Sequence, residues 1–501
     1  MPQTNKRMIT TAVKTELEAY FASFRDGIIG IDQEFETPYG TKPLIYTDWT
    51  ASGRLYRPIE EKLMDTFGPF VANTHTETTV SGTAMTLAYH EAKQIIKRHV
   101  NASPNDVLIN TGTGMTGVVN KFQRILGLKV PENLKDYLTL PTQIKPVVFV
   151  SHMEHHSNQT SWIETIADVV IIPANDEGLF CLEQFKKVVA QYAERSFKIA
   201  SITSCSNVTG IRTPYHEVAK IMHQNNGVCF IDFACSGPYV HIDMHPADPE
   251  AYLDAIFFSP HKFLGGPGTS GVLIFNKNLY KNNVPDCPGG GTVSWTNPWG
   301  EHKYIDDIED REDGGTPGFL QVIKTALAIQ LKETMGVENI MKREHELVDY
   351  IFDHLAPVEN LTLLAGQHRD RLGVISFYIH DLHYNLGVKI LNDRFGIQTR
   401  GGCSCAGTYG HYLLHVDQET SHHLTCSIDE GDLTQKPGWI RMSIHPTTTS
   451  AEIEYVCKSI IALAANHQEW ATDYVYNPKK NDFTHQNAEA VEKAMVKSWF
   501  I

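Results

Sequence analysis

The sequence predicts an α/β protein whose mostly parallel sheet is covered by helices on both faces. Short β-rich runs recur along the chain, amphipathic helical segments separate them, and the runs are continuously apolar. Such runs are typical of parallel strands that are buried on both faces and joined by crossover helices. The chain of 501 residues also exceeds the length at which a single core normally stops growing, so we expect at least two domains.

The predicted strands lie within residues 46–320, which we expect to form the larger domain. Amphipathic segments, for example 182–192 and 215–224, alternate with them. Because ligands of such sheets bind outside the carboxyl ends of the strands, the residues that follow each strand are candidates for a site. The strands are predicted at 107–110, 147–151, 169–173, 199–203, 228–232, 255–259 and 271–275.

After Pro317 the pattern changes to long helical stretches and separated strands, which predicts a smaller α+β domain over 321–501. We expect residues 1–45 to form an N-terminal segment that packs on this domain. The histidine-rich stretch 413–437 is polar and lacks a periodic apolar face. It is predicted to be an inserted loop that covers the site, binds a metal or contacts a partner. The expected elements are helices at 319–334, 337–355 and 451–464 and a strand at 374–379.

The composition excludes several classes of protein. Lys and Arg number 43 against 58 for Asp and Glu, and the formal charge of -15 provides no basic field for a nucleic-acid partner. No run approaches the roughly 18 apolar residues of a membrane span, and residues 1–13 lack the apolar core of a signal peptide. We therefore expect a cytoplasmic protein. Nine cysteines without regular spacing are expected to be mostly reduced and buried.

One lysine stands between an apolar strand end and a glycine-rich loop. Lys262 occurs in the sequence Ser-Pro-His-Lys-Phe-Leu-Gly-Gly-Pro-Gly, and the glycines let a flat ligand approach the backbone and the lysine closely. Asp232 ends another predicted strand, 30 residues upstream. A lone lysine is more often a solvated charge, and a lone aspartate is more often a turn residue. Neither residue by itself indicates a catalytic role.

Imidazoles follow the predicted strand 147–151. The ring of His155 could stack on a cofactor or move a proton. Metal ligation by His155 and His156 is the alternative. No cysteine or carboxylate set at zinc spacing accompanies them beyond the adjacent Glu154, so the sequence favours a site without metal.

A glycine-rich turn follows the predicted strand 107–110 and opens a helix. Gly112, Gly114 and Gly117 have the spacing Gly-x-Gly-x-x-Gly, and the first helical amides together with Thr116 could bind phosphate. A dinucleotide site would also need an acidic residue at the end of the next strand to hold ribose. Because the region 130–140 is predicted to be a loop, a phosphate site is favoured over nicotinamide binding.

The order of these motifs resembles the site of class-V aminotransferase-like enzymes, and most closely that of cysteine desulfurases and selenocysteine lyases. The likeness begins near residue 46, includes 72–75 and extends to residue 443. It implies a PLP-dependent transferase of fold type I, in which the sheet domain binds pyridoxal 5′-phosphate (PLP). The resemblance depends on Glu154-His155, Ser206-Asn207, Asp232 and Ser259-Pro-His261-Lys262.

The resemblance implies a role for each matching residue. Lys262 would form the Schiff base with PLP, His155 would stack on the ring, and Asp232 would hold the pyridine nitrogen. Asn207 would meet the phenolic oxygen. The family usually has a glutamine for the same purpose three residues after Asp232, where this chain has Cys235. The phosphate would be held by Gly114, Met115, Thr116, Ser259 and His261, and by Thr316 from the second subunit of a homodimer.

The likeness extends to the substrate. Arg441 matches the arginine that clamps the substrate carboxylate, a task suited to a planar bidentate donor. We expect it to bind a small amino acid together with Asn207 and Ala51. Residues 399–407 resemble the desulfurase loop that bears the sulfur-accepting cysteine, and they put Cys405 at the nucleophile position. Attack on a substrate sulfur would require this thiol to be ionised and exposed in a mobile loop.

The resemblance leads to one functional hypothesis and two alternatives. As a cysteine desulfurase-like enzyme, the protein would convert L-cysteine to L-alanine. Lys262 would remove the α-proton, and Cys405 would take the sulfur as a persulfide for an acceptor protein. The first alternative is a reaction without the persulfide, namely amino transfer, epimerisation or C–S or C–Se lysis. The second is a non-catalytic scaffold, which leaves the co-occurrence of lysine, aspartate, histidine and arginine unexplained.

Overall fold

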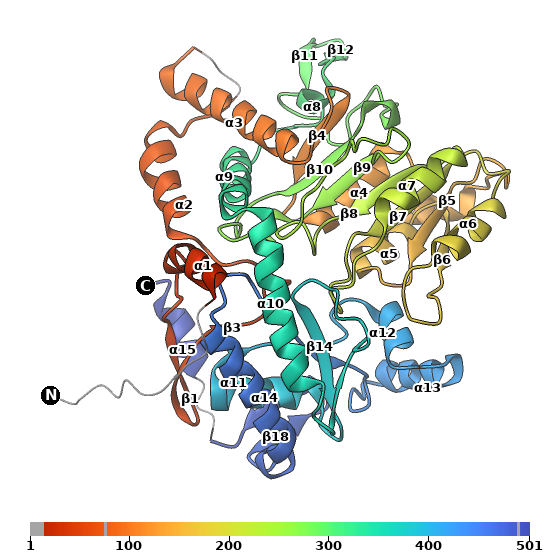
Figure 1. The fold of residues 1–501 in the computed structure, drawn as a ribbon. Coiled ribbons are helices and arrows are strands. Elements are labelled where there is room, and N and C mark those ends of the chain that lie inside the picture. The colour runs from red at the N-terminus through yellow and green to blue at the C-terminus, as the bar shows by residue number, and fades with distance from the viewer. Residues whose placement is uncertain (1–14, 75–77, 488–490) are drawn as a thin grey trace.

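A seven-stranded sheet forms the centre of the larger domain (Figure 1). In spatial order its strands are β4 (Asp106–Thr111), β10 (Gly271–Asn276), β9 (Ala255–Phe258), β8 (Val228–Asp232), β7 (Lys198–Thr203), β5 (Val147–Ser151) and β6 (Asp168–Ile172). β10 runs antiparallel to β4 and β9, and the other neighbouring strands pair in parallel. Each predicted β-rich run is a strand of this sheet, so the predicted mostly parallel sheet is confirmed.

The computed structural model describes residues 15–74, 78–487 and 491–501. Residues 1–14 of the predicted N-terminal segment and residue 75 of the resemblance therefore lie outside the described residues. Within the described ranges, no helix has both the length and the apolarity needed to cross a lipid bilayer.

Two apolar clusters cover the two faces of the large sheet. Successive side chains of a strand point to opposite faces, so in β8 Cys229 and Ile231 belong to one cluster and Phe230 to the other. Because both faces are buried, the strand sequences are continuously apolar. The first cluster includes side chains of α3 (Val80–His99), α6 (Leu182–Ala190), α7 (Tyr215–Gln224) and α9 (Phe319–Met335), and the second includes side chains of α4 (Met115–Ile125) and α5 (His156–Ile163).

A four-stranded antiparallel sheet forms the centre of the smaller domain, which lies below the larger one in Figure 1. Its strands in spatial order are β13 (Leu361–Leu363), β14 (Val374–Ile379), β17 (Trp439–Ser443) and β16 (Arg400–Gly402). The side chains of three helices complete its separate apolar core, and these helices are α10 (Val337–Leu355), α11 (Tyr384–Phe395) and α14 (Ser450–Ala471).

The expected domain boundary at residue 320 falls too early. Buried side chains of α9 belong to the core of the larger domain, where this helix packs against α3. The change to the second core occurs along α10, whose later residues face the smaller sheet. The change of pattern after Pro317 marks the N-cap of α9 at Gly318, not the end of the domain.

The described part of the N-terminal segment contacts the smaller domain. α1 (Glu16–Asp26) packs on α10, and Arg25 pairs with Glu452 of α14 at 2.5 Å. β3 (Ile45–Tyr46) pairs in parallel with β15 (Ile397–Gln398). The other strands and α-helices outside residues 407–429 are β1 (Glu34–Thr37), β2 (Gly40–Pro43), α2 (Arg57–Lys62), β11 (Val293–Thr296), β12 (His302–Tyr304), α8 (Ile308–Arg311), β18 (Tyr474–Asn477), β19 (Asp482–His485) and α15 (Val491–Ser498).

The prediction that residues 413–437 form a loop is wrong, because a helix occupies the middle of this stretch. α12 (Gly407–Leu413) leads into a second helix, α13 (Gln418–Asp429), at the edge of the molecule (Figure 1). The side chain of Asp417 caps α13 by accepting a hydrogen bond from the backbone N–H of Thr420 at 2.8 Å. No residue of α13 is buried, so this helix has no periodic apolar face that its sequence could reveal.

Candidate active site

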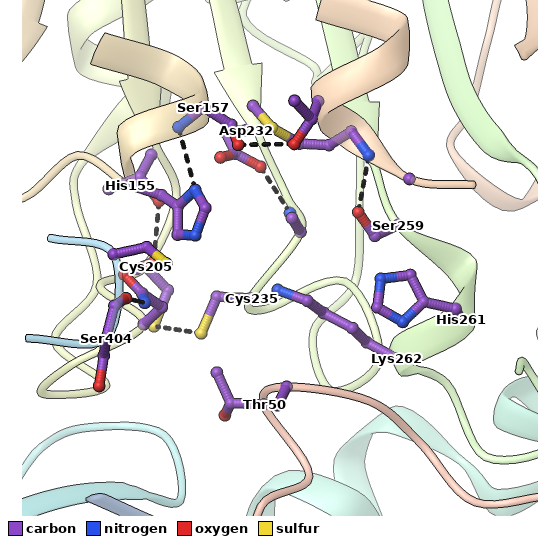
Figure 2. Close-up of a pocket in the computed structure, with 18 of the residues that line it drawn as sticks. Thr50, His155, Ser157, Cys205, Asp232, Cys235, Ser259, His261, Lys262 and Ser404 are labelled. Carbon is purple, nitrogen blue, oxygen red and sulfur yellow. Dashed lines mark hydrogen bonds between the residues drawn. The ribbon is translucent and has the colours of Figure 1, made fainter. Parts of the chain in front are cut away.

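The carboxyl ends of the parallel strands and the smaller domain enclose a cavity of about 300 Å³ (Figure 2). A ligand in this cavity would meet side chains from both domains, at the sheet edge where the sequence predicted a site. Of the predicted site residues, all of which the structure describes, Thr316 does not line the cavity. Those that line it are Ala51, Gly114, Met115, Thr116, His155, Asn207, Asp232, Cys235, Ser259, His261, Lys262, Cys405 and Arg441.

Lys262 reaches into the cavity from a short 3₁₀ turn that follows β9 (Figure 2). Its amine makes no hydrogen bond or ion pair with the described residues. Burial lowers the pKa of this amine, while Cys235 and Asp232 act in the opposite direction. The glycine-rich loop allows this close packing, because a Cβ at Gly266 would lie 1.9 Å from the carbonyl oxygen of Pro260. An unpartnered amine with a lowered pKa is suited to condensing with a carbonyl group.

Asp232 lies at the end of β8 and is 3% exposed. Its Oδ1 accepts a hydrogen bond from the backbone N–H of Ala234 at 2.7 Å. Burial raises the pKa of this carboxyl to about 6, although that N–H and the Lys262 ammonium act to lower it. A protonated pyridine nitrogen beside Asp232 would supply the missing positive charge and favour the carboxylate.

The first turn of α4 and the turn after β9 form an anion cradle. The backbone N–H of Met115 donates to Ser259 Oγ at 2.8 Å, and the hydroxyls of Thr116 and Ser157 lie 2.6 Å apart. A Cβ at Gly114 would lie 3.1 Å from Ser259 Oγ, so the missing side chain keeps this space open. Helix amides and hydroxyl donors at the positive end of a helix dipole are suited to a phosphate group.

His155 caps α5 and faces the cavity (Figure 2). Its Nδ1 accepts a hydrogen bond from the backbone N–H of Ser157 at 3.1 Å, which leaves Nε2 for the proton of the neutral ring. Burial, assisted by the Lys262 ammonium, lowers the pKa of His155 to about 3. The ring is therefore uncharged near pH 7 and can stack on a flat ligand. Across the described chain, no group of three or more His, Cys, Asp or Glu side chains is arranged to hold a metal.

The adjacent Glu154 is a buried hub beneath the cavity. Its Oε1 accepts hydrogen bonds from Ser151 Oγ at 2.5 Å and from the backbone N–H of Thr203 at 2.8 Å. Its Oε2 accepts from Asn158 Nδ2 at 2.7 Å. Burial raises the pKa of Glu154 to about 8. This hub joins the ends of β5 and β7 and thereby fixes the residues that follow them, His155 included.

Arg441 projects from β17, but it does not face the cavity as a free group. One of its terminal nitrogens donates to the backbone oxygen of Asn207 at 3.0 Å, and the other donates to Asp48 Oδ1 at 2.7 Å. The second oxygen of Asp48 accepts from Arg400 Nε at 2.9 Å. Arg400 also lines the cavity, and its side chain is about half exposed. Asp48 and Arg400 were not among the predicted site residues, so the charged cluster around Arg441 is larger than predicted.

The loop that carries Cys405 is exposed at the cavity and attached at several points. The backbone N–H of His156 donates to Cys405 O at 2.8 Å, and Asn207 Nδ2 donates to Ser404 O at 2.7 Å. Ser404 and Cys405 both have left-handed backbone conformations, with φ of 51° and 57°, which are uncommon for side chains of this type. The thiol is thus accessible, as sulfur attack requires, on a loop that the neighbouring strand ends hold in place.

Several lining residues were absent from the predicted site. Each ends or follows a predicted strand, adjoins a predicted site residue or lies in the 399–407 loop, so closeness to those motifs is the signal that could have found them. The amide donor of Asn207 meets the Cys405 loop, and its Oδ1 has no partner among the described residues. The missed residues are Thr50, Thr113, Gly117, Ser157, Thr203, Cys205, Ala234, Arg400 and Ser404.

The side chains of this cavity fit PLP. An amine without a partner can bind the aldehyde, and a buried carboxyl with a raised pKa can face the pyridine nitrogen. A neutral imidazole can cover the ring, and a helix N-terminus with two serine hydroxyls can hold the phosphate. These groups come from Lys262, Asp232, His155 and the anion cradle.

Comparison with known proteins gives a family and a set of relatives. The family model described as Aminotransferase class-V matches residues 45–456. A probable cysteine desulfurase of Halalkalibacterium halodurans is 30% identical over 372 residues, which are 73% of this chain and 84% of the relative. A probable cysteine desulfurase of Staphylococcus epidermidis is 28% identical over 375 residues, which are 74% of this chain and 85% of the relative.

Two solved structures have a similar fold. The cysteine desulfurase from Thermococcus onnurineus NA1 has a TM-score of 0.68 at 21% identity, with 84% of this chain and 95% of that chain covered. The cysteine desulfurase CsdA from Escherichia coli has a TM-score of 0.69 at 19% identity, with 89% of this chain and 98% of that chain covered. At these identities the likeness is one of fold.

Proposed function

Because the chain belongs to the class-V aminotransferase family, we propose that it is a cysteine desulfurase-like enzyme, which converts L-cysteine to L-alanine and holds the sulfur as a persulfide on Cys405. It is a PLP-dependent enzyme and has the fold type I architecture that the sequence resemblance implied. The proposal concerns the substrate, the reaction and the residues that perform it.

The residues around the ring prepare the cofactor. Bound PLP supplies an electron sink for the bonds at the substrate α-carbon. Lys262 would hold the cofactor covalently at rest, and its amine would then take the α-proton of the substrate. Asp232 would keep the ring nitrogen protonated, and the neutral ring of His155 would cover one face and exclude water. The anion cradle would hold the phosphate.

The second half of the cavity would bind the amino acid and receive its sulfur. Arg441 and Arg400 would orient the substrate carboxylate near Ala51, and Asp48 would set the positions of both guanidinium groups. Cys405 would attack the substrate sulfur as a thiolate, forming an S–S bond as the C–S bond breaks. The electron pair of the broken bond stays with carbon, which takes a proton and becomes alanine.

One observation supports this assignment above the others: an exposed cysteine, Cys405, lines the same cavity as the reactive amine of Lys262. Its exposure would also let an acceptor protein collect the sulfur. Cys205 and Cys235 also line the cavity but are buried, whereas Cys287 and Cys426 are exposed but do not line it.

The experiment compares three variants of the PLP-loaded protein. Lys262→Ala should abolish turnover of L-cysteine. Cys405→Ala should retain the absorbance of bound PLP, while alanine formation falls by at least about a hundredfold and no persulfide forms. The control is Cys426→Ala, which removes an exposed thiol of α13 and should behave like the unmodified protein. Undiminished alanine formation by Cys405→Ala would instead favour amino transfer, epimerisation or direct C–S or C–Se lysis.

We also propose that the protein is a homodimer in which Thr316 completes the phosphate site of the partner subunit. Thr316 lies outside its own cavity, and Asn73 Nδ2 approaches its hydroxyl at 3.5 Å. Large apolar side chains are exposed on the adjacent segment 63–71 and along α3, as expected of a surface that pairs with another chain. They are Met64, Phe70, Val71, Val80 and Leu87.

A further inference from the structure

Two thiols lie against each other inside the active-site cavity. Cys205 follows β7, and Cys235 follows the neighbouring strand β8. Their sulfur atoms are 4.0 Å apart, and each lies 3.6 Å from the carbonyl oxygen of Ser206. Both cysteines are free, buried and part of the cavity lining. A disulfide bond is about 2.05 Å long, so the two sulfurs would have to approach each other by about 2 Å.

One of these thiols has an electrostatic environment that favours the thiolate. The amine of Lys262 points toward Cys235, and the sulfur of Cys235 points toward Cys205 (Figure 2). While Lys262 is a free ammonium, the pKa of Cys235 lies below its ordinary value, because its contact with the Cys205 thiol and the charge of that ammonium outweigh burial. Burial raises the pKa of Cys205. The pair therefore combines a reactive thiolate with a protonated thiol, the combination found in redox-active dithiols.

We propose that Cys205 and Cys235 are a redox-active pair, which a small hydroperoxide entering the cavity converts to a disulfide. With hydrogen peroxide, the thiolate of Cys235 attacks one oxygen in the first step, so that an S–O bond forms as the O–O bond breaks. This gives a sulfenic acid, and the leaving hydroxide takes a proton and departs as water. In the second step the sulfur of Cys205 displaces the sulfenic hydroxyl, which leaves as a second water. Two thiols are oxidised and one peroxide is reduced, so that atoms and electrons balance.

The disulfide changes the surroundings of the reactive lysine. It removes the ionisable thiol that lies beside Lys262 and draws the Cys235 sulfur toward Cys205. A thiol reductant reverses the reaction. The proposal is independent of the assigned substrate, because it needs only the two thiols and a cavity wide enough for a peroxide.

Peptide mapping tests the proposal. The purified protein, both free of PLP and loaded with it, is treated with a few equivalents of hydrogen peroxide, alkylated and digested with trypsin. Cleavage after Lys and Arg places Cys205 on peptide 199–212, whereas Cys229 and Cys235 share peptide 221–262. The expected product is a cross-link between these two peptides, with fragment ions that place it on Cys235. It should lose two hydrogen atoms relative to the separate peptides and disappear when a reductant is added before alkylation.

Two variants and an internal control complete the test. Cys229→Ser should retain the cross-link, and Cys235→Ser should lose it. If Cys235→Ser does not fold, the fragment ions of the unmodified protein still decide which sulfur is linked. The exposed Cys287 and Cys426 report the extent of oxidation. The proposal is overturned if these two are oxidised while Cys205 and Cys235 are recovered as thiols, or as sulfinic acids without a cross-link.

Discussion

At the scale of single residues, burial holds several ionisable groups of this protein in their neutral forms. Burial raises the pKa of Glu154 and Glu344 to about 8 and lowers the pKa of His155 and His445 to about 3. Glu344 on α10 is fully buried, and the backbone N–H of Gly373 only partly offsets the effect of burial on the pKa of its carboxyl. The protein accepts such groups because they remain uncharged, which links its stability to pH.

The buried carboxyls and the buried imidazoles have opposite effects on how the stability of the protein changes with pH. A native carboxyl with a raised pKa keeps a proton that the unfolded chain loses above about pH 4.5, so its contribution to stability falls as pH rises toward 8. A native imidazole with a lowered pKa refuses a proton that the unfolded chain takes below about pH 6.5, so its contribution falls as pH drops toward 3. With two groups of each kind, the opposing slopes cancel between about pH 4.5 and 6.5, so these buried groups favour maximal stability across that range.

Replacing Glu344 by Gln should reduce the loss of unfolding free energy as the pH rises from about 6 to 8. The neutral amide has nearly the same shape and no proton to lose. The unfolding free energy of the unmodified protein, relative to Glu344→Gln, should fall by about 1.4 kcal/mol per pH unit between pH 6 and 8. Denaturant unfolding at several pH values measures this difference. The exposed Glu338→Gln on the same helix is the control, and an equal slope in the unmodified protein and Glu344→Gln would contradict the prediction.

At the scale of elements, the phosphate cradle depends on close backbone packing between β10, β4 and the start of α4. A Cβ at Gly271 would lie 2.5 Å from the carbonyl oxygen of Gly114 and 2.9 Å from that of Thr111. Either the strand or the first turn of α4 would have to move. The helix amides that we assign to the phosphate would then lose their alignment with the hydroxyl of Ser259.

Gly271→Ala should therefore weaken PLP binding by about tenfold or more, equivalent to about 1.4 kcal/mol. Absorbance titration of the cofactor-free protein with PLP gives the Kd, and circular dichroism checks that the variant is folded. Gly289→Ala is the matched control, because a Cβ there has no atom within 4 Å. A folded Gly271→Ala that binds PLP as tightly as the control would show that the cradle is elsewhere.

At the scale of the whole molecule, the two domains meet at the active site and each supplies part of it. The larger domain provides the amine, the carboxyl and the anion cradle, and the smaller domain provides Arg441, Arg400 and the Cys405 loop. In the proposed homodimer a third contribution, Thr316, would come from the partner subunit. Cofactor binding should then depend on the state of association.

The double substitution Met64→Glu with Leu87→Glu should shift the protein from dimer to monomer, because charges on an apolar interface are costly to desolvate. Sedimentation equilibrium should give twice the chain mass for the unmodified protein. The monomer should also bind PLP more weakly, since the partner's hydroxyl is lost. Val475→Glu is the control, with an exposed apolar residue on the β18–β19 hairpin. A monomeric unmodified protein would contradict both parts of the prediction.

The sequence alone determined the strands of the large sheet and the residues that follow them. Both depend on local signals, namely apolar runs bounded by glycine and polar residues. Lys262 and Asp232 could be assigned to strand ends for this reason, and the packing of parallel strands brings such ends together. The helix α13 escaped prediction because it has no buried face and depends on a local cap.

Only the tertiary structure decided which distant side chains meet. Arg441 is paired with Asp48 across 393 positions of sequence, and the sulfurs of Cys205 and Cys235 touch although 30 positions separate them. Such contacts depend on how strands are ordered and how two domains close on each other. Neither property has a period or a spacing in the chain, because long-range packing and burial select these contacts after the local elements have formed.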